Sequence, residues 1–122
     1  MLEILDAPDN VIAMRAAGTM DAADYDRIIE VIEIRLKTHD RIGVVADMTD
    51  FTDFTGEVLL KDLRWNAAHI GDWGKFPRCA MVTDKAWLRV MAQTFSPLIP
   101  GVEMRVFEPG RLEDALAWAS GV

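Results

Sequence analysis

Three aspartates follow one another at intervals of three residues, Asp47, Asp50 and Asp53, within the stretch DMTDFTDFTGE. Carboxylates at such density suggest a metal site. A calcium loop of the EF-hand type needs oxygen ligands at alternating positions, a glycine at the sixth position and a glutamate at the twelfth. Here Gly56 is tenth counting from Asp47, so the pattern does not match. A looser magnesium site at a strand end is the alternative to plain turn chemistry, and we predict no metal.

The same stretch carries a hydroxyl group near its end, that of Thr55. Thr55 directly precedes GEVLLKDL, at the position where an N-cap residue belongs. A hydroxyl at this position lies beside free helix N–H groups, which also stabilise a phosphate. Asp50 and Asp53 would repel such a group. The interpretation we favour for Thr55 is a simple helix cap.

Two further sets of polar residues could do chemistry. Asp62 and His69 lie two helical turns apart with Trp65 between them and could form a catalytic pair, but no nucleophile accompanies them. The interpretation we favour for them is a solvated polar edge. Another four residues follow predicted strands, where open α/β sheets bind ligands: Asp47, Thr49, Thr83 and Asp84. The chain has no phosphate-binding glycine loop and no G-x-S-x-G motif. We therefore predict a protein that is not an enzyme and has no cofactor.

The elements that position these residues follow from hydrophobic periodicity and turn signals. Strands are predicted at 2–5, 10–18, 42–48, 78–84 and 102–108, and helices at 20–40, 57–72, 85–95 and 110–120. The order ββαβαβαβα predicts an α/β fold with a mixed, mostly parallel five-stranded sheet flanked by helices. The short connection after the first strand makes the first pair an antiparallel hairpin.

Each helix is predicted to bury one stripe. Asp21 caps the first helix, with Asp24 three residues on, and the buried stripe is Tyr25, Ile28, Ile29, Ile32 and Leu36, which leaves Ile34 exposed. The second helix is predicted to bury Leu59, Leu63, Ile70 and Trp73, with Val58, Asp62, Trp65 and His69 on its other side. Asp84 is predicted to cap the third helix.

Composition restricts the class of protein. A chain of 122 residues is predicted to form a single domain, residues 1–122. The only cysteine, Cys79, excludes an internal disulfide and favours a cytoplasmic location, and no segment is apolar enough to span a membrane. The formal net charge of -7 disfavours nucleic acid as a partner.

The apolar content is high for a chain of this charge, at 51%. Some of this apolar surface exceeds what one small core hides, which predicts either a hydrophobic pocket or a homodimer. Ile34 and Trp65 are the candidate dimer contacts.

The order and spacing of three segments resemble a known family. The segments are VVADMTDF, KDLRWNAAHIGDWGKFPRCAMVTDKAW and MRVFEPGRLEDALAWA. Together they resemble the SpoIIAA-like family of small bacterial proteins, related to STAS (anti-sigma-factor antagonist) domains. The resemblance implies a mixed sheet flanked by helices and no established enzymatic activity. STAS domains carry a phosphorylatable hydroxyl at the start of the helix after the corresponding strand, and that position falls on Thr55. This chain departs from the Ser-rich STAS pattern there.

The family is also likened to the lipid-carrying CRAL-TRIO domains, which implies an apolar, lipid-like ligand. The third helix and the FSPLIPG stretch after it carry more apolar residues than one stripe needs. We therefore predict a STAS-like binding or regulatory module for a small hydrophobic ligand or a protein partner. The predicted ligand residues are Trp65, Trp87, Met91, Phe95, Leu98 and Ile99. The alternative is a phosphoregulated partner-switching protein that uses Thr55.

Overall fold

The structure, a computed structural model, describes residues 1–99 and 101–122, except for the side chain of Phe95. The main sheet has the strand order β1-β2-β4-β6-β7, with β1 antiparallel to β2 and the other neighbours parallel. Its strands are β1 (Leu2–Leu5), β2 (Val11–Ala16), β4 (Gly43–Asp47), β6 (Arg78–Val82) and β7 (Glu103–Phe107). The predicted mixed, mostly parallel five-stranded α/β fold is confirmed.

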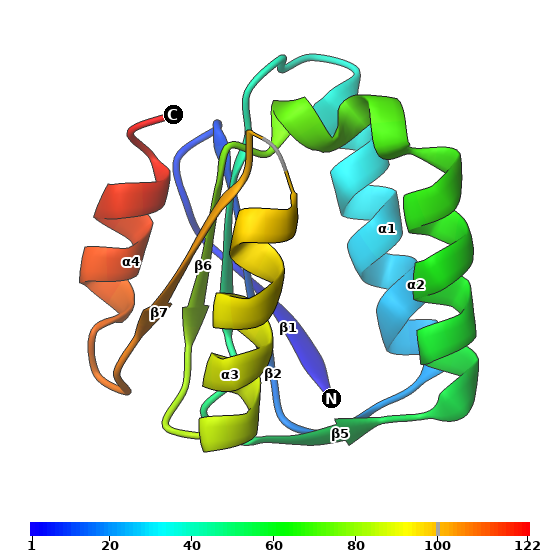
Figure 1. The fold of residues 1–122 in the computed structure, drawn as a ribbon, viewed down its shortest axis with the longest axis vertical. Helices are drawn as coiled ribbons and strands as arrows, with labels where there is room; N and C mark the ends of the chain where they lie inside the picture. Colours follow the sequence, from blue (N-terminus) through cyan, green and yellow to red (C-terminus); the bar gives the residue numbers. More distant parts are fainter. Residues whose placement is uncertain (100) are drawn as a thin grey trace.

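Helices cover the two faces of this sheet unequally. Figure 1 shows α4 (Leu112–Ala119) alone on one side, and α1 (Ala22–Leu36), α2 (Gly56–Ala68) and α3 (Ala86–Phe95) on the other. Two short 3₁₀ helices, η1 (Ile70–Lys75) and η2 (Ser96–Leu98), follow α2 and α3. The core is accordingly divided by the sheet into two clusters. Leu88 and Phe51 belong to the larger one, and Val45 and Ala115 belong to the cluster beneath α4.

A second, two-stranded sheet was not predicted. It pairs β3 (Gly18–Met20) with β5 (Phe51–Phe54) in parallel. The predicted strand 10–18 ends early because Gly18 adopts φ 66, a left-handed conformation that glycine reaches without a steric penalty, and the chain leaves the main sheet there. The stretch interpreted as a turn after β4 therefore contains a strand.

The start of α1 matches the prediction. The backbone N–H of Asp24 donates to the Asp21 carboxylate at 2.9 Å, and the Asp21 N–H donates to the Asp24 carboxylate at 3.4 Å, which forms a capping box. Ile34 is 55% exposed, as predicted. The predicted Asp84 cap of α3 is wrong. The N-cap residue is Lys85, and its N–H donates to the Thr83 hydroxyl at 3.0 Å.

The predicted core stripe of α2 is also wrong. Leu59, Leu63 and Ile70 are 49%, 69% and 59% exposed. The side of α2 that packs against the rest of the protein is the one expected to be polar, where Val58 is 2% exposed and Trp65 and His69 are half-buried. The reason is that α2 packs on α1 and not on the sheet. Its most apolar face is therefore turned away from α1.

Candidate functional site

The main sheet is sealed on one face and only partly covered on the other. Toward α4, Val45 and Val82 are 0% and 1% exposed. Alternate residues of a strand project to opposite faces, and on the other face of the same two strands the side chains are only half-buried: Val44, Ala46, Cys79 and Met81. Central strands between two helical layers are normally apolar and covered on both sides. This face therefore lacks part of its cover.

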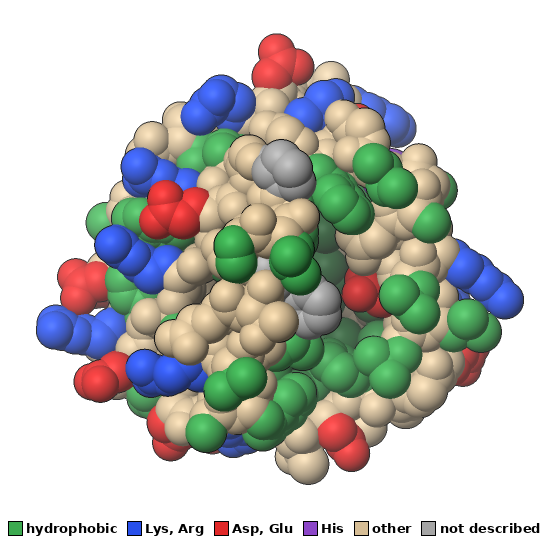
Figure 2. Space-filling view, viewed as in Figure 1, with side chains coloured by type: hydrophobic (Ala, Val, Ile, Leu, Met, Phe, Trp, Pro, Cys, Tyr) green, Lys and Arg blue, Asp and Glu red, His purple; other side chains and the backbone are tan. Residues whose placement is uncertain are grey.

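The uncovered side chains line a cavity. It has a volume of about 170 Å³, and Ala92 of α3 and Met104 of β7 line it together with those four residues. Ala80 and Arg105 also line it, although Ala80 packs in the cluster beneath α4 and the Arg105 guanidinium lies over the Trp118 ring of α4. Figure 2 shows the surface hollowed between α3 and α2, with hydrophobic side chains along the hollow. We call this region the central groove and define it by Val44, Ala46, Cys79, Met81, Ala92 and Met104. A cavity lined by apolar side chains favours an apolar occupant over water.

The thiol of Cys79 is part of this lining. Burial raises the pKa of Cys79 to about 11, so the group stays uncharged at neutral pH. Its Sγ lies 4.0 Å from the carbonyl oxygen of Phe76, a weak contact. An uncharged thiol is a poor nucleophile. Cys79 therefore acts as a small apolar side chain.

Most of the predicted ligand residues lie on or after α3. Met91 is half-buried and packs against the larger core cluster. Trp87 is 46% exposed, and its ring centroid lies 6.2 Å from that of Phe51. Leu98, in η2, is 66% exposed, and Ile99 is half-buried. The predicted ligand residue Phe95 falls on a side chain outside the described residues.

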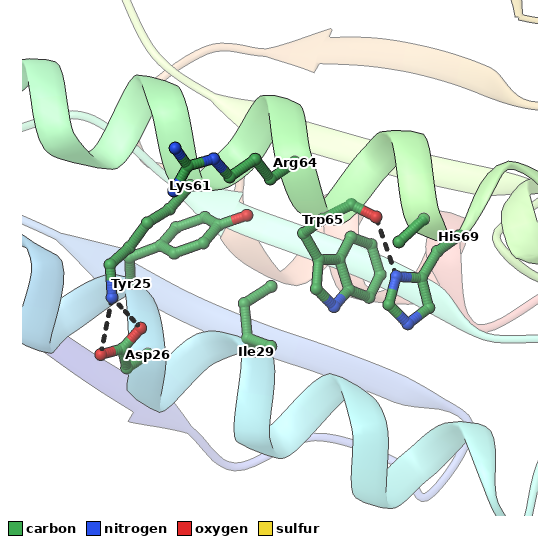
Figure 3. A pocket seen from close by; sticks show the side chains of 8 residues that line it. Tyr25, Asp26, Ile29, Lys61, Arg64, Trp65 and His69 are labelled. Carbon is green, nitrogen blue, oxygen red and sulfur yellow. Dashed lines mark hydrogen bonds and ion pairs between the residues drawn. The ribbon is translucent and has the colours of Figure 1, made fainter.

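Trp65 lies apart from these residues. It is half-buried between α1 and α2, where its indole Nε1 donates to Glu33 at 3.3 Å. Its ring stacks on the His69 imidazole at a centroid distance of 4.1 Å and an angle of 15°. Figure 3 shows the Trp65 ring with Ile29 of α1 on one side and the His69 ring on the other. The structure therefore does not bring Trp65 together with the α3 residues into one site.

The contact between α1 and α2, which we call the α1–α2 seam, is rich in polar groups. The Tyr25 hydroxyl donates to the Asp62 carboxylate at 2.8 Å, and Lys61 forms an ion pair with Asp26 at 2.9 Å (Figure 3). Burial, and then the bond to Asp62, raises the pKa of Tyr25 above its ordinary value. Asp62 bonds to Tyr25 and Asn66, whereas the His69 Nδ1 bonds to the carbonyl of Trp65. Asp62 and His69 therefore have different partners, and the contacts show no catalytic pair.

The polar residues after β4 and β6 bond to one another. Asp47 is 8% exposed and accepts from the Thr49 hydroxyl at 2.7 Å and from Arg15 Nε at 3.2 Å. Burial acts to raise the pKa of Asp47, but these bonds outweigh it and hold that pKa below its ordinary value. Lys85 Nζ donates to the Thr49 carbonyl at 3.0 Å. The groups thus have their partners within the chain, as structural residues do.

The aspartate stretch forms no metal centre. Across residues 1–99 and 101–122, no group of three histidine, cysteine, aspartate or glutamate side chains is placed to hold a metal ion. Asp50 is exposed, and Asp53 accepts from the Thr19 hydroxyl at 2.7 Å, across the β3–β5 pair. Thr55 is the N-cap of α2, and its hydroxyl accepts from the Val58 N–H at 3.3 Å. The capping role predicted for Thr55 is confirmed.

Sequence reasoning missed the residues of the central groove. The apolar runs of β4 and β6 contain no alternation of apolar and polar residues, which is typical of strands buried on both faces. The half-burial of Ala46 and Met81 arises from where α2 and α3 lie, which no strand pattern encodes.

Of the helices described, none combines the length and the apolar composition that a membrane span requires.

Comparisons with known proteins agree on a single group. A family model described as SpoIIAA-like matches residues 11–120. A solved structure of an uncharacterised protein from Shewanella loihica PV-4, of the DUF3478 family with a SpoIIAA-like fold, has a TM-score of 0.74 at 22% identity, over 98% of this chain and 92% of that one. The anti-sigma factor antagonist SpoIIAA, in its unphosphorylated form, has a TM-score of 0.56 at 13% identity, over 100% of both chains. None of the curated proteins compared matches. The two structural likenesses show the fold.

Proposed function

The chain belongs to the SpoIIAA-like family, and on that premise we propose that it is a non-enzymatic binding module whose central groove holds a small apolar, lipid-like molecule. The observation that carries the proposal is the contrast between the two faces of β4 and β6. Val45 and Val82 are sealed beneath α4, whereas Ala46 and Met81 line a cavity. A domain this small is expected to bury as much apolar surface as it can, because its stability depends mainly on that burial.

The chemistry of the lining supports an apolar ligand. The side chains of the central groove are aliphatic or sulfur-containing, and the thiol of Cys79 is uncharged. Methionine side chains, here Met81 and Met104, are flexible and fit irregular apolar shapes. The cavity, at about 170 Å³, is smaller than the roughly 300 Å³ at which drug-sized sites begin. The remainder of a ligand would lie in the hollow between α2 and α3, beside Trp87.

A bulky substitution on the groove floor tests this proposal. Ala46→Trp places an indole in the cavity, and Ala117→Trp makes the same change at an exposed position of α4. Native mass spectrometry of protein purified from cells, with melting temperatures across a panel of fatty acids, alcohols and sterols, measures binding. We expect a bound mass or a ligand-dependent rise in melting temperature for wild type and Ala117→Trp, and neither for Ala46→Trp.

A second variant guards against misfolding of Ala46→Trp. Met104→Gln keeps the length of the side chain while it adds a polar amide to the groove lining, and it should weaken binding while retaining the wild-type circular dichroism spectrum. If wild type binds no member of the panel, or if Ala46→Trp and Met104→Gln bind as wild type does, the groove is not a ligand site.

A partner-switching role is the second candidate, and the N-cap position of Thr55 is the observation that favours it. A phosphate on this hydroxyl would meet the free N–H groups at the start of α2, although Asp53 and Glu57 would repel it. Phosphopeptide analysis of protein from its native host tests the modification. Thr55→Ala and Thr55→Asp should then differ in the partners they retain on a column. Absence of a phosphopeptide together with unchanged partners for both variants rejects this role.

A further inference from the structure

One face of α2 is exposed and has no partner among the residues that the structure describes. Gly56, Leu60, Leu63 and Ala67 are spaced four, three and four residues apart, and all four are exposed, with Leu60 at 48% and Leu63 at 69%. Ile70 continues the spacing into η1 and is 59% exposed. A repeat of fours and threes places these side chains along one side of the helix, as in helices that pair with each other. We call this set the α2 stripe.

The α2 stripe is not part of the α1–α2 seam. Each residue of an α-helix is rotated by about 100° from the one before it, so Leu60 and Leu63 lie roughly opposite to Val58 and Trp65. Val58 and Trp65 face α1, and Val58 is 2% exposed. The stripe also differs from the lining of the central groove, which contains no residue of α2.

Two opposite charges flank the stripe. Glu57 and Arg64 are seven residues apart, two helical turns, and each directly follows a stripe residue, Gly56 and Leu63. Both are exposed, and neither forms an ion pair with another of the described residues. In an antiparallel pair of identical helices, the beginning of one helix lies beside the end of the other. Glu57 would then approach Arg64 of the second copy, and Arg64 would approach Glu57 of the second copy.

We propose that the α2 stripe is a homodimer interface, in which α2 of two copies pack antiparallel about a two-fold axis with reciprocal Glu57–Arg64 ion pairs. A two-fold axis makes each such contact occur twice, as in most homodimers. The occupant is a second copy rather than an anionic lipid surface because the chain has a net charge of -7 and because the flanking Glu57 and Arg64 complement the same two residues of a second copy. The proposal places neither Ile34 nor Trp65 in the contact, since Trp65 is held between α1 and α2.

The expected affinity is modest. A single pair of short helices buries less than the roughly 1,200 Å² at which stable interfaces begin, so we expect a dimer that dissociates on dilution. This dimer does not depend on the proposed ligand. Its failure would leave ligand binding to the central groove intact, and a groove without a ligand would leave the dimer intact.

A charge exchange tests the geometry. Glu57→Arg alone places two arginines together at each contact, and Arg64→Glu alone places two glutamates together. The double variant Glu57→Arg/Arg64→Glu restores opposite charges. In sedimentation velocity over a concentration series, we expect each single variant to weaken the dimer about tenfold and the double variant to recover most of the loss. Recovery in the double variant identifies the antiparallel pairing, which a general effect of charge would not produce.

Three controls separate the outcomes. Leu63→Glu should be monomeric with the wild-type circular dichroism spectrum, whereas Ile34→Glu, an equal change on the exposed side of α1, should dimerise as wild type does. Wild-type protein that sediments as a monomer at roughly millimolar concentration, or a dimer that persists in Leu63→Glu, overturns the proposal. Binding to phosphatidylglycerol–phosphatidylcholine vesicles by a wild-type monomer, lost in Leu63→Glu, would assign the stripe to a lipid surface instead and also overturns it.

Discussion

The hydroxyl of Tyr25 on α1 donates a hydrogen bond to the Asp62 carboxylate on α2 at 2.8 Å, and Asn66 donates to the same carboxylate oxygen at 3.1 Å. Tyr25 is 8% exposed, so this contact lies at the inner side of the α1–α2 seam. Because the apolar stripe of α2 faces solvent, polar contacts of this kind carry much of the attachment of α2 to the rest of the protein.

Tyr25→Phe should lower the free energy of unfolding by about 1 kcal/mol at neutral pH, because it removes the hydrogen bond to Asp62. The pKa of Tyr25 is raised in the folded protein, whereas an unfolded tyrosine ionises near pH 10. The stabilisation is therefore complete below about pH 10 and is lost as pH rises above it. Urea unfolding of both proteins at neutral pH and at about pH 11 measures this. A difference that stays constant between the two conditions would contradict it.

Asp47→Asn should lower the free energy of unfolding by about 1–3 kcal/mol at neutral pH, since an uncharged amide accepts more weakly from Thr49 and Arg15. The pKa of Asp47 lies below its ordinary value in the folded protein. Its contribution is therefore present above about pH 4 and disappears as pH falls through the folded pKa. The two unfolding curves should converge in acid. Asp50→Asn, at an exposed position, should stay within about 0.5 kcal/mol of wild type throughout.

Gly43→Ala should be strongly destabilising. A Cβ at this position would collide with the backbone carbonyl oxygen of Ala119, so α4 would have to move away from the sheet. Overpacking of this kind costs about 1–3 kcal/mol, and contact with backbone atoms places the change at the upper end. Gly71→Ala is the matched control because nothing lies within 4 Å of its added Cβ. Thermal unfolding of the two variants compares them, and equal melting temperatures would reject the close packing of α4.

The same truncation, leucine to alanine, should lower the free energy of unfolding strongly at Leu88 and very little at Leu63. Leu88, on the inner side of α3, is 0% exposed, and its truncation should cost about 2–5 kcal/mol. Leu63 is 69% exposed, so its truncation should cost less than about 0.5 kcal/mol in dilute solution. Urea unfolding at low protein concentration, where a dimer would dissociate, gives both values. A large loss for Leu63→Ala under these conditions would mean that α2 packs on its leucine stripe after all.

Thr55→Ala should cost about 1 kcal/mol, because the N–H of Val58 loses its acceptor. Thr55→Ser keeps the hydroxyl and should retain most of the stability. Chemical denaturation of the three proteins tests the cap by itself. A similar loss in both variants would show that the threonine methyl group, rather than the hydroxyl, stabilises this end of α2.

Sequence predicted best what short segments decide. Asp21 and Asp24 form their capping box from residues three apart, and the mostly parallel pairing of the main sheet follows from the alternation of strands and helices. The face of α2 was predicted wrongly for a tertiary reason. Leu59, Leu63 and Ile70 form a clear apolar pattern, but a pattern does not say whether a partner exists to cover it. The half-burial of Ala46 and Met81 has the same origin, because it depends on how far α2 and α3 lie from each other.

Alternate residues of β4 and β6 face two different environments, α4 on one side of the sheet and the central groove on the other. Along β4, Val45 faces α4 while Val44 and Ala46 face the central groove, and β6 repeats the arrangement with Ala80 and Val82 against Cys79 and Met81. The residues of the first set are constrained by packing beneath α4, and those of the second set by the molecule that enters the groove. A redesign could therefore rewrite every second residue of these strands to change the shape of the groove, and the half of the molecule sealed by α4 would keep its sequence.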